Sequence, residues 1–261
     1  MKFVIAPDSF KGSLTAVQAA DIIARAVQEE MPDAEAVRIP MADGGEGTVD
    51  ALVAAAGGQT VAIDVTGPLG ARIPSYYGVI GQTAVVEAAN LFGLPLVPEA
   101  DRNPLNTTSA ALGEAIVAAL DAGYSRIIVG LGGSSTNDGG IGMLTALGAV
   151  FADETGERLR GFGRDLLRLR RADFGGLDPR IRNADITVAC DVANPLLGNE
   201  GASFVYGPQK GADAAMCKRL DAAMAIYADQ VEAIFGERRD HPGAGAAGGL
   251  GFALLALGAK L

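Results

Sequence analysis

The sequence is poor in the side chains that most often build metal centres, disulfide frameworks and large aromatic cores. Its 261 residues include no tryptophan, one histidine (His241) and two cysteines (Cys190 and Cys217). A single histidine excludes a histidine-clustered metal site and disfavours a serine–histidine triad, and two cysteines cannot form a disulfide framework. We therefore expect a protein of the cytoplasm.

Positive charge is also scarce. Lysine and arginine number 21 against 31 acidic residues, which gives a net charge of −10 and disfavours nucleic acid or an anionic membrane as a partner. No stretch approaches the ~20 continuous apolar residues of a membrane span, and the N-terminus lacks the pattern of a signal peptide. An anionic ligand must therefore be held by local cations, and two of the five lysines, Lys11 and Lys210, lie in glycine-bearing loops.

The pattern of apolar residues predicts an α/β protein with two lobes. A short apolar run at 2–6, a helical pattern at 16–31, a second strand at 35–40 and a helix at 49–58 form a βαβα unit, which is typical of a parallel sheet. From Gly67 onwards strand-like runs are separated by turn signals, which indicates a partly antiparallel region. We expect residues 1–66 with about 241–261 to form a partial flavodoxin-like or Rossmann-like domain, and 67–240 to form a second, mixed α/β domain.

Aspartates follow several predicted strands. The segments beginning at Asp8 and Asp43 both read Asp-x-x-x-Gly-Ser/Thr, and Asp191 follows a third apolar strand. Ligands of parallel sheets bind outside the carboxyl ends of the strands, so these carboxylates are expected on one rim. A single loop aspartate is more often a helix cap, whereas three at successive strand ends favour a functional site.

The segment "GLGGSSTNDGG", residues 130–140, is the richest loop in the chain. Glycine lets a ligand approach the main chain closely, and successive N–H groups can surround phosphate oxygens, although such a loop is as often a tight turn. Ser135 stands where a dinucleotide fingerprint needs its last glycine, and no Gly-x-x-x-x-Gly-Lys-Ser/Thr occurs. Aspartates, lysines and glycine loops together supply the groups that phosphoryl transfer requires.

Six segments in order, "APDSFKGSLTAVQAA", "MADGGEGTVDAL", "VGLGGSSTNDGGIGML", "CDVANPLLG", "YGPQKGA" and "PGAGAAGGLG", resemble the bacterial type of glycerate kinase, and the resemblance covers nearly the whole chain. It implies a kinase that uses ATP and Mg²⁺ to phosphorylate D-glycerate, with 2-phosphoglycerate as the usual product and 3-phosphoglycerate as the alternative. It also implies an active site in the cleft between two α/β lobes.

The matching positions give a set of candidate site residues. The candidate catalytic residues are Asp8, Lys11, Asp43 and Asp191. The candidate substrate- and phosphate-binding residues are Ser9, Ser13, Gly44, Gly45, Gly132, Gly133, Ser134, Ser135, Thr136, Asp138, Asn194, Gln209 and Lys210. From their chemistry, the lysines neutralise phosphate or carboxylate, and either Asp43 or Asp191 accepts the hydroxyl proton or holds Mg²⁺.

The resemblance further implies a βαβ stretch beyond residue 261 that returns to complete the sheet of the first lobe. We therefore expect that sheet to be incomplete here, with an exposed apolar edge. A catalytically inactive anion-binding protein or fragment is the alternative function. Whether the protein forms a homo-oligomer is left open by the sequence.

Overall fold

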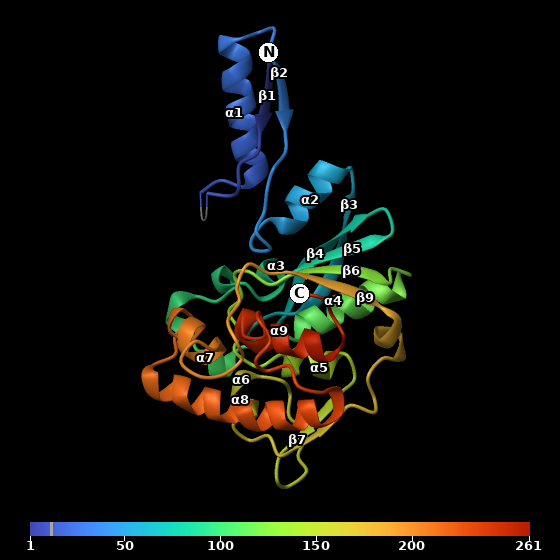
Figure 1. Cartoon of the computed structure of the whole chain (residues 1–261), viewed down its shortest axis with the longest axis vertical. Coiled ribbons are helices and arrows are strands. Elements are labelled where there is room, and N and C mark those ends of the chain that lie inside the picture. The colour runs from blue at the N-terminus through green and yellow to red at the C-terminus, as the bar shows by residue number, and fades with distance from the viewer. Residues whose placement is uncertain (11–12) are drawn as a thin grey trace.

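The computed structural model describes residues 1–10 and 13–261. The chain opens with β1 (Lys2–Ile5), α1 (Ala16–Glu30) and β2 (Glu35–Arg38), and β1 and β2 pair in parallel as a two-stranded sheet. These three elements, here called the N-terminal unit, stand apart from the rest of the molecule at the blue end of Figure 1. Helix α1 begins with a capping box, because the hydroxyl of Thr15 accepts the N–H of Gln18 and the Gln18 side chain accepts the N–H of Thr15.

The remainder, here called the body, is built on a five-stranded sheet in the order β3-β4-β5-β6-β9. Strands β3, β4 and β5 pair antiparallel, whereas β5, β6 and β9 run parallel. The predicted α/β class, with one parallel and one mixed part, is therefore confirmed. The bounds of the sheet strands are β3 Gln59–Thr66, β4 Arg72–Ile80, β5 Thr83–Glu87, β6 Arg126–Gly130 and β9 Asp185–Ala189.

Helices cover both faces of this sheet. Gly78 of β4 faces Val49 and Val53 of α2 (Thr48–Ala56), whereas the neighbouring Tyr77 is buried in the main core. Successive strand residues point to opposite faces, so α2 lies on the face opposite that core. The other elements of the body are α3 (Ala88–Phe92), α4 (Ala110–Asp121), α5 (Ile141–Ala146), β7 (Val150–Ala152), α6 (Gly163–Leu166), β8 (Arg171–Asp173), α7 (Ala202–Tyr206), α8 (Ala214–Phe235) and α9 (Ala246–Ala256).

One hydrophobic core runs through the body. It joins the sheet to α4, α5, α8 and α9, and its largest buried side chains include Tyr77, Tyr227, Phe92, Phe151 and Phe252. Strand β5 is buried on both faces, as expected for a strand with helices above and below it. Among the helices that the structure describes, none combines the length and the apolar character needed to cross a membrane.

The expected division of the chain does not match the observed arrangement in two places. Residues 59–66 were expected in the first domain, but they form β3 and pair along their whole length with β4. Residues 241–261 were also expected there, but α9 packs into the core of the body and the backbone of Lys260 bonds to Ile186 and Val188 of β9. Tertiary pairing thus limits the separate part to β1, α1 and β2.

Candidate active site

A cavity of about 320 Å³ opens where the carboxyl ends of β6 and β9 meet the loop before α2. It brings together nine of the predicted site residues from the segments that follow β1, β2, β6 and β9 and from the stretch before α8. They are Ser9, Asp43, Gly45, Gly132, Gly133, Ser134, Asp191, Gln209 and Lys210. Residues far apart in the sequence therefore surround one space, and those at strand ends come from strands in two different sheets rather than from one common rim.

The loop of Asp43–Gly47 interlocks with the glycine loop that follows β6. The carbonyl oxygen of Gly44 accepts the N–H of Gly132 at 2.9 Å, and Asp43 Oδ1 accepts the N–H of Gly45 at 2.9 Å. Gly44 has φ +90°, and a Cβ there would lie 2.5 Å from the carbonyl oxygen of Ala189. Only glycine permits this backbone conformation at so close an approach, so the loop is fixed against both β6 and β9.

Lys210 is the buried cation of the cavity. Its side chain is 2% exposed, and Nζ donates to the carbonyl oxygen of Thr136 at 2.6 Å and to Ser134 Oγ at 3.2 Å. Burial lowers the pKa of Lys210 to about 7, and the charge of Asp138 opposes this shift. Neither direct partner carries a negative charge, so an anion in the cavity would favour the ammonium form.

Asp138 lies behind the cavity and does not line it. Its carboxylate accepts the N–H of Ser109 at 2.8 Å, the hydroxyl of Ser109 at 2.7 Å and the N–H of Gly140 at 3.0 Å. Ser109 precedes α4 and Gly140 precedes α5, so this fully buried carboxylate caps two helices. Burial nonetheless raises its pKa above the ordinary value.

Other predicted site residues also lie outside the cavity lining. Ser135 donates to the carbonyl oxygen of Phe92, and Thr136 is buried. Ser13 lines a neighbouring cavity of about 210 Å³ that it shares with Ser9. Three further positions, Asp8, Gly44 and Asn194, do not reach the main cavity, and Lys11 falls outside the described residues. The functional roles of all these residues stay predictions.

Two carboxylates of the cavity suit a divalent cation. Asp43 and Asp191 are both exposed and both line it, whereas the described residues hold no group of three or more acidic, histidine or cysteine side chains arranged for a metal. Mg²⁺ is commonly held by one or two carboxylates together with substrate phosphates. The donor set therefore fits a cation that arrives with a phosphate ligand.

Sequence reasoning missed Tyr206 and Cys190, which also line the cavity. The hydroxyl of Tyr206 donates to Asn194 Oδ1 at 2.6 Å, and Asn194 Nδ2 donates to the carbonyl oxygen of Glu200 at 2.7 Å. The predicted residue Asn194 therefore orients a residue of the wall. The sequence signal for these two residues is their closeness to predicted site residues. Tyr206 lies three residues before Gln209, and Cys190 lies directly before Asp191.

Comparison with known proteins decides the family. The model of the glycerate kinase family matches residues 3–261. The chain belongs to the glycerate kinase family. It is 50% identical over 265 residues to glycerate 2-kinase of Escherichia coli strain K12, covering 100% of this chain and 70% of that protein. It is 51% identical over 258 residues to glycerate kinase of Bacillus subtilis strain 168, covering 98% of this chain and 68% of that protein.

A solved structure agrees with the sequence comparisons. The crystal structure of a proposed glycerate kinase 2 from Salmonella typhimurium LT2 superposes with a TM-score of 0.90 at 50% identity, covering 100% of this chain and 71% of that chain. The resemblance identified from the motifs is thereby confirmed, and so is the kinase class of its relatives. All six motif segments of this chain contribute residues to the wall of the cavity described above.

Proposed function

We propose that this protein is a glycerate kinase that transfers a phosphoryl group from ATP to a hydroxyl of D-glycerate, forming 2-phosphoglycerate. The observation that carries the proposal is the single cavity in which Asp43, Asp191, Ser134 and Lys210 meet. Two carboxylates, a hydroxyl and a buried lysine are the groups that phosphoryl transfer to an alcohol needs. Membership of the family adds support for glycerate as the acceptor.

Lys210 and the glycine loops hold the negative charge of the reactants. The ammonium of Lys210 reaches the cavity from a buried position fixed by Ser134 and Thr136, so binding of an anion costs little ordering of this side chain. Gly132 and Gly133 present main chain at the wall, where no side chain obstructs an approaching phosphate. These groups orient the phosphate chain and the carboxylate of glycerate.

Asp43 and Asp191 have the two remaining roles, which are metal binding and proton acceptance. Mg²⁺ bound with ATP supplies positive charge that offsets the charge on the transferred group. One of the two aspartates would hold this ion, and the other accepts the proton of the attacking hydroxyl. Both lie on loops at strand ends, and the loop of Asp43 is fixed by Gly44, so the acceptor can be held in line with little motion.

Coupled ADP release tests the proposal. The purified chain is assayed with ATP, Mg²⁺ and D-glycerate, with L-glycerate and no acceptor as controls, and phosphorus NMR identifies the ester. Turnover that depends on D-glycerate and yields 2-phosphoglycerate is expected. A sole product of 3-phosphoglycerate contradicts the position of transfer, and no turnover from a folded, monodisperse sample contradicts the kinase and favours an anion-binding protein.

The cytoplasm is the location that we propose for this protein, and a small molecule is its partner. Cys190 and Cys217 are both free thiols, which supports the cytoplasm. The net charge of −10 supports a small molecule rather than nucleic acid or an anionic membrane as the partner. A homo-oligomer is compatible with the proposal and is read directly from the elution volume of the same sample.

A further inference from the structure

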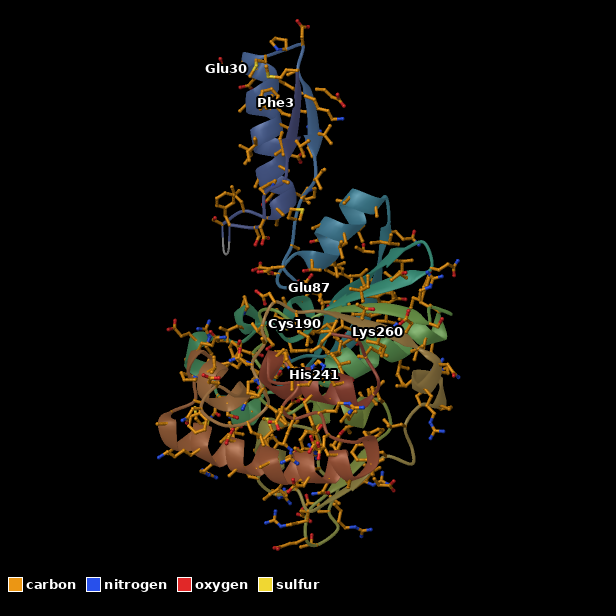
Figure 2. All side chains as sticks on the ribbon, in the orientation of Figure 1. Phe3, Glu30, Glu87, Cys190, His241 and Lys260 are labelled. Carbon is orange, nitrogen blue, oxygen red and sulfur yellow. The ribbon has the colours of Figure 1, made fainter. Side chains whose placement is uncertain are left out.

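Glu87 is a buried carboxylate that the predicted site did not include. It is the last residue of β5, it is 2% exposed, and it does not line the main cavity. Figure 2 shows it at the end of the body that faces the N-terminal unit. Burying an ionisable side chain is costly, so its hydrogen bonds indicate what it contributes.

Both carboxylate oxygens of Glu87 accept hydrogen bonds from a segment that lies about forty residues earlier in the chain. Oε1 accepts the N–H of Gly47 at 2.9 Å, and Oε2 accepts the N–H of Val49 at 2.8 Å. These N–H groups belong to the start of α2, whose N-cap is Gly47 with φ 86° and no side chain to serve as a cap. Glu87 therefore caps α2 from a neighbouring strand and places a negative charge at its positive end.

The same contacts fix the loop that carries Asp43. At one end of this loop Gly44 is held by its bond to the N–H of Gly132, and at the other end Gly47 is held by Glu87. The cavity residues Gly45 and Glu46 lie between these two attachments, and Asp43 directly precedes the first of them. The first attachment is backbone to backbone, whereas Glu87 holds the second with a side chain from a distant strand. Thr48 adds a local bond, because its Oγ1 donates to the carbonyl oxygen of Gly45 at 2.8 Å.

We propose that Glu87 is a positioning residue of this kinase, which fixes the Asp43–Gly47 loop on the sheet through the N–H groups of Gly47 and Val49 and so holds Asp43 toward Asp191 and Lys210. This inference rests on the proposed function for its kinetic consequences. The anchoring itself is a structural claim that can be measured without catalysis.

The charge on Glu87 should matter, because the acceptor strength of a carboxylate falls when it is protonated. Burial raises the pKa of Glu87 to about 7, and the bonds from Val49 and Gly47 oppose this shift. The titratable groups that act on it are Asp50 of α2, Glu46 of the loop and Tyr76 of β4, and the two carboxylates raise its pKa further. The loop is therefore held most firmly above about pH 7.

The test compares Glu87→Gln with the wild type and with a matched control, Asp165→Asn. Asp165 is also buried, and its Oδ2 accepts two backbone N–H groups, those of Arg160 and Phe162, at 3.0 Å each, away from the cavity. Steady-state kinetics between pH 5.5 and 9 and hydrogen exchange of a peptide spanning residues 44–52 are measured for all three. Glu87→Asp, which keeps the charge but is one methylene shorter, serves as the conservative variant.

For Glu87→Gln at pH 8 we expect kcat to fall about tenfold or more, KM for ATP to change less than about threefold, and exchange in 44–52 to become faster. Its kcat/KM should also lose a decline that the wild type shows below about pH 7. Asp165→Asn should keep near-wild-type kinetics, and Glu87→Asp should lie between the wild type and Glu87→Gln.

Wild-type kinetics or wild-type exchange in Glu87→Gln would overturn the inference, as would equal kinetic losses in Glu87→Gln and Asp165→Asn. If Glu87→Gln does not fold, Glu87→Asp and Asp165→Asn decide by the same criteria. If the wild type itself shows no turnover with glycerate, the proposed function fails, and hydrogen exchange alone decides whether Glu87 anchors the loop.

Discussion

The N-terminal unit and the body bury their apolar residues to very different extents. In the N-terminal unit the buried apolar cluster consists of Ile5, Ala20 and Ala24, while Val4 is 60% and Ile22 46% exposed. The body surrounds both faces of its sheet with helices and shares one continuous core. Two strands and one helix bury only one face, so the N-terminal unit gains much less free energy from burial for each residue that it orders.

This difference extends to the candidate site. Lys210 and Ser134 are buried in the body, and Asp43 is held to the body through Gly44. Among the described residues of the N-terminal unit and its loops, Ser9 by contrast is the one that lines the cavity together with these groups. The described charged groups Lys210 and Asp43 are thus held by the body, and Ser9 lies on the side of the cavity formed by the N-terminal unit.

The largest difference in stability should appear on matched truncations of the two cores. Ile116 of α4 is fully buried in the body, so Ile116→Ala should lower the free energy of unfolding by about 2–5 kcal/mol. Ile5→Ala should leave the main transition nearly unchanged, because it removes contacts only within the N-terminal unit. Urea denaturation followed by circular dichroism measures both, and equal losses would mean that the two regions unfold as one.

A comparison of Lys210→Met with Ser9→Ala should separate the two sides of the cavity. Loss of the buried ammonium should reduce kcat at least about 100-fold, whereas Ser9→Ala should cost no more than about tenfold. Methionine fills a similar volume, so the fold should persist. A Lys210→Met variant with kcat within about tenfold of wild type would remove this lysine from the chemistry.

The lowered pKa of Lys210 also predicts how the free energy of unfolding changes with pH. Burial lowers its pKa from 10.5 to about 7, so the folded state binds fewer protons than the unfolded state between these values. The contribution of Lys210 to the free energy of unfolding should therefore increase as pH rises from about 7 to 10.5, and Lys210→Met should lack this increase. Denaturation curves of both proteins across this range give the difference, and parallel pH dependences would contradict the lowered pKa of Lys210.

Sequence reasoning predicted those parts of the site that depend on strand ends. Asp43 and Asp191 each follow an apolar run that ends in a polar loop, and parallel pairing of β6 and β9 brings Asp191 beside the glycine loop after β6. Asp43 follows β2 of the other sheet and reaches the same place through the bond between Gly44 and Gly132. The capping box of Thr15 and Gln18 is also a local pattern, because its two residues are three apart. Such features are set by local patterns, which a single sequence displays.

Features that depend on distant contacts could not be predicted in this way. Glu87 ends an apolar run without any local sign that its partners are Gly47 and Val49. Asp138 has the same sequence context as a phosphate ligand, but its position between the starts of α4 and α5 makes it a double cap. Strand β3 belongs to the body because it pairs with β4. This pairing depends on register and burial, which are set by the folded chain and not by the local sequence.

The smallest predicted effect comes from removing one helix cap in the N-terminal unit and an equivalent cap in the body. Thr15 caps α1 of the N-terminal unit, and Asp213 caps α8 of the body by accepting the N–H of Met216 at 2.7 Å. Each substitution by alanine should cost about 1 kcal/mol. For Asp213→Ala this loss should lower the midpoint of global unfolding, because α8 belongs to the main core.

For Thr15→Ala the loss should stay local, because few buried contacts link α1 to the main core. The amides of α1 should exchange about fivefold faster, because a loss of about 1 kcal/mol raises the population of a locally opened helix by that factor. The amides of α8 should keep wild-type rates. Native-state hydrogen exchange of both variants measures this. Faster exchange throughout the body of Thr15→Ala would show that the N-terminal unit supports the site more strongly than its small core suggests.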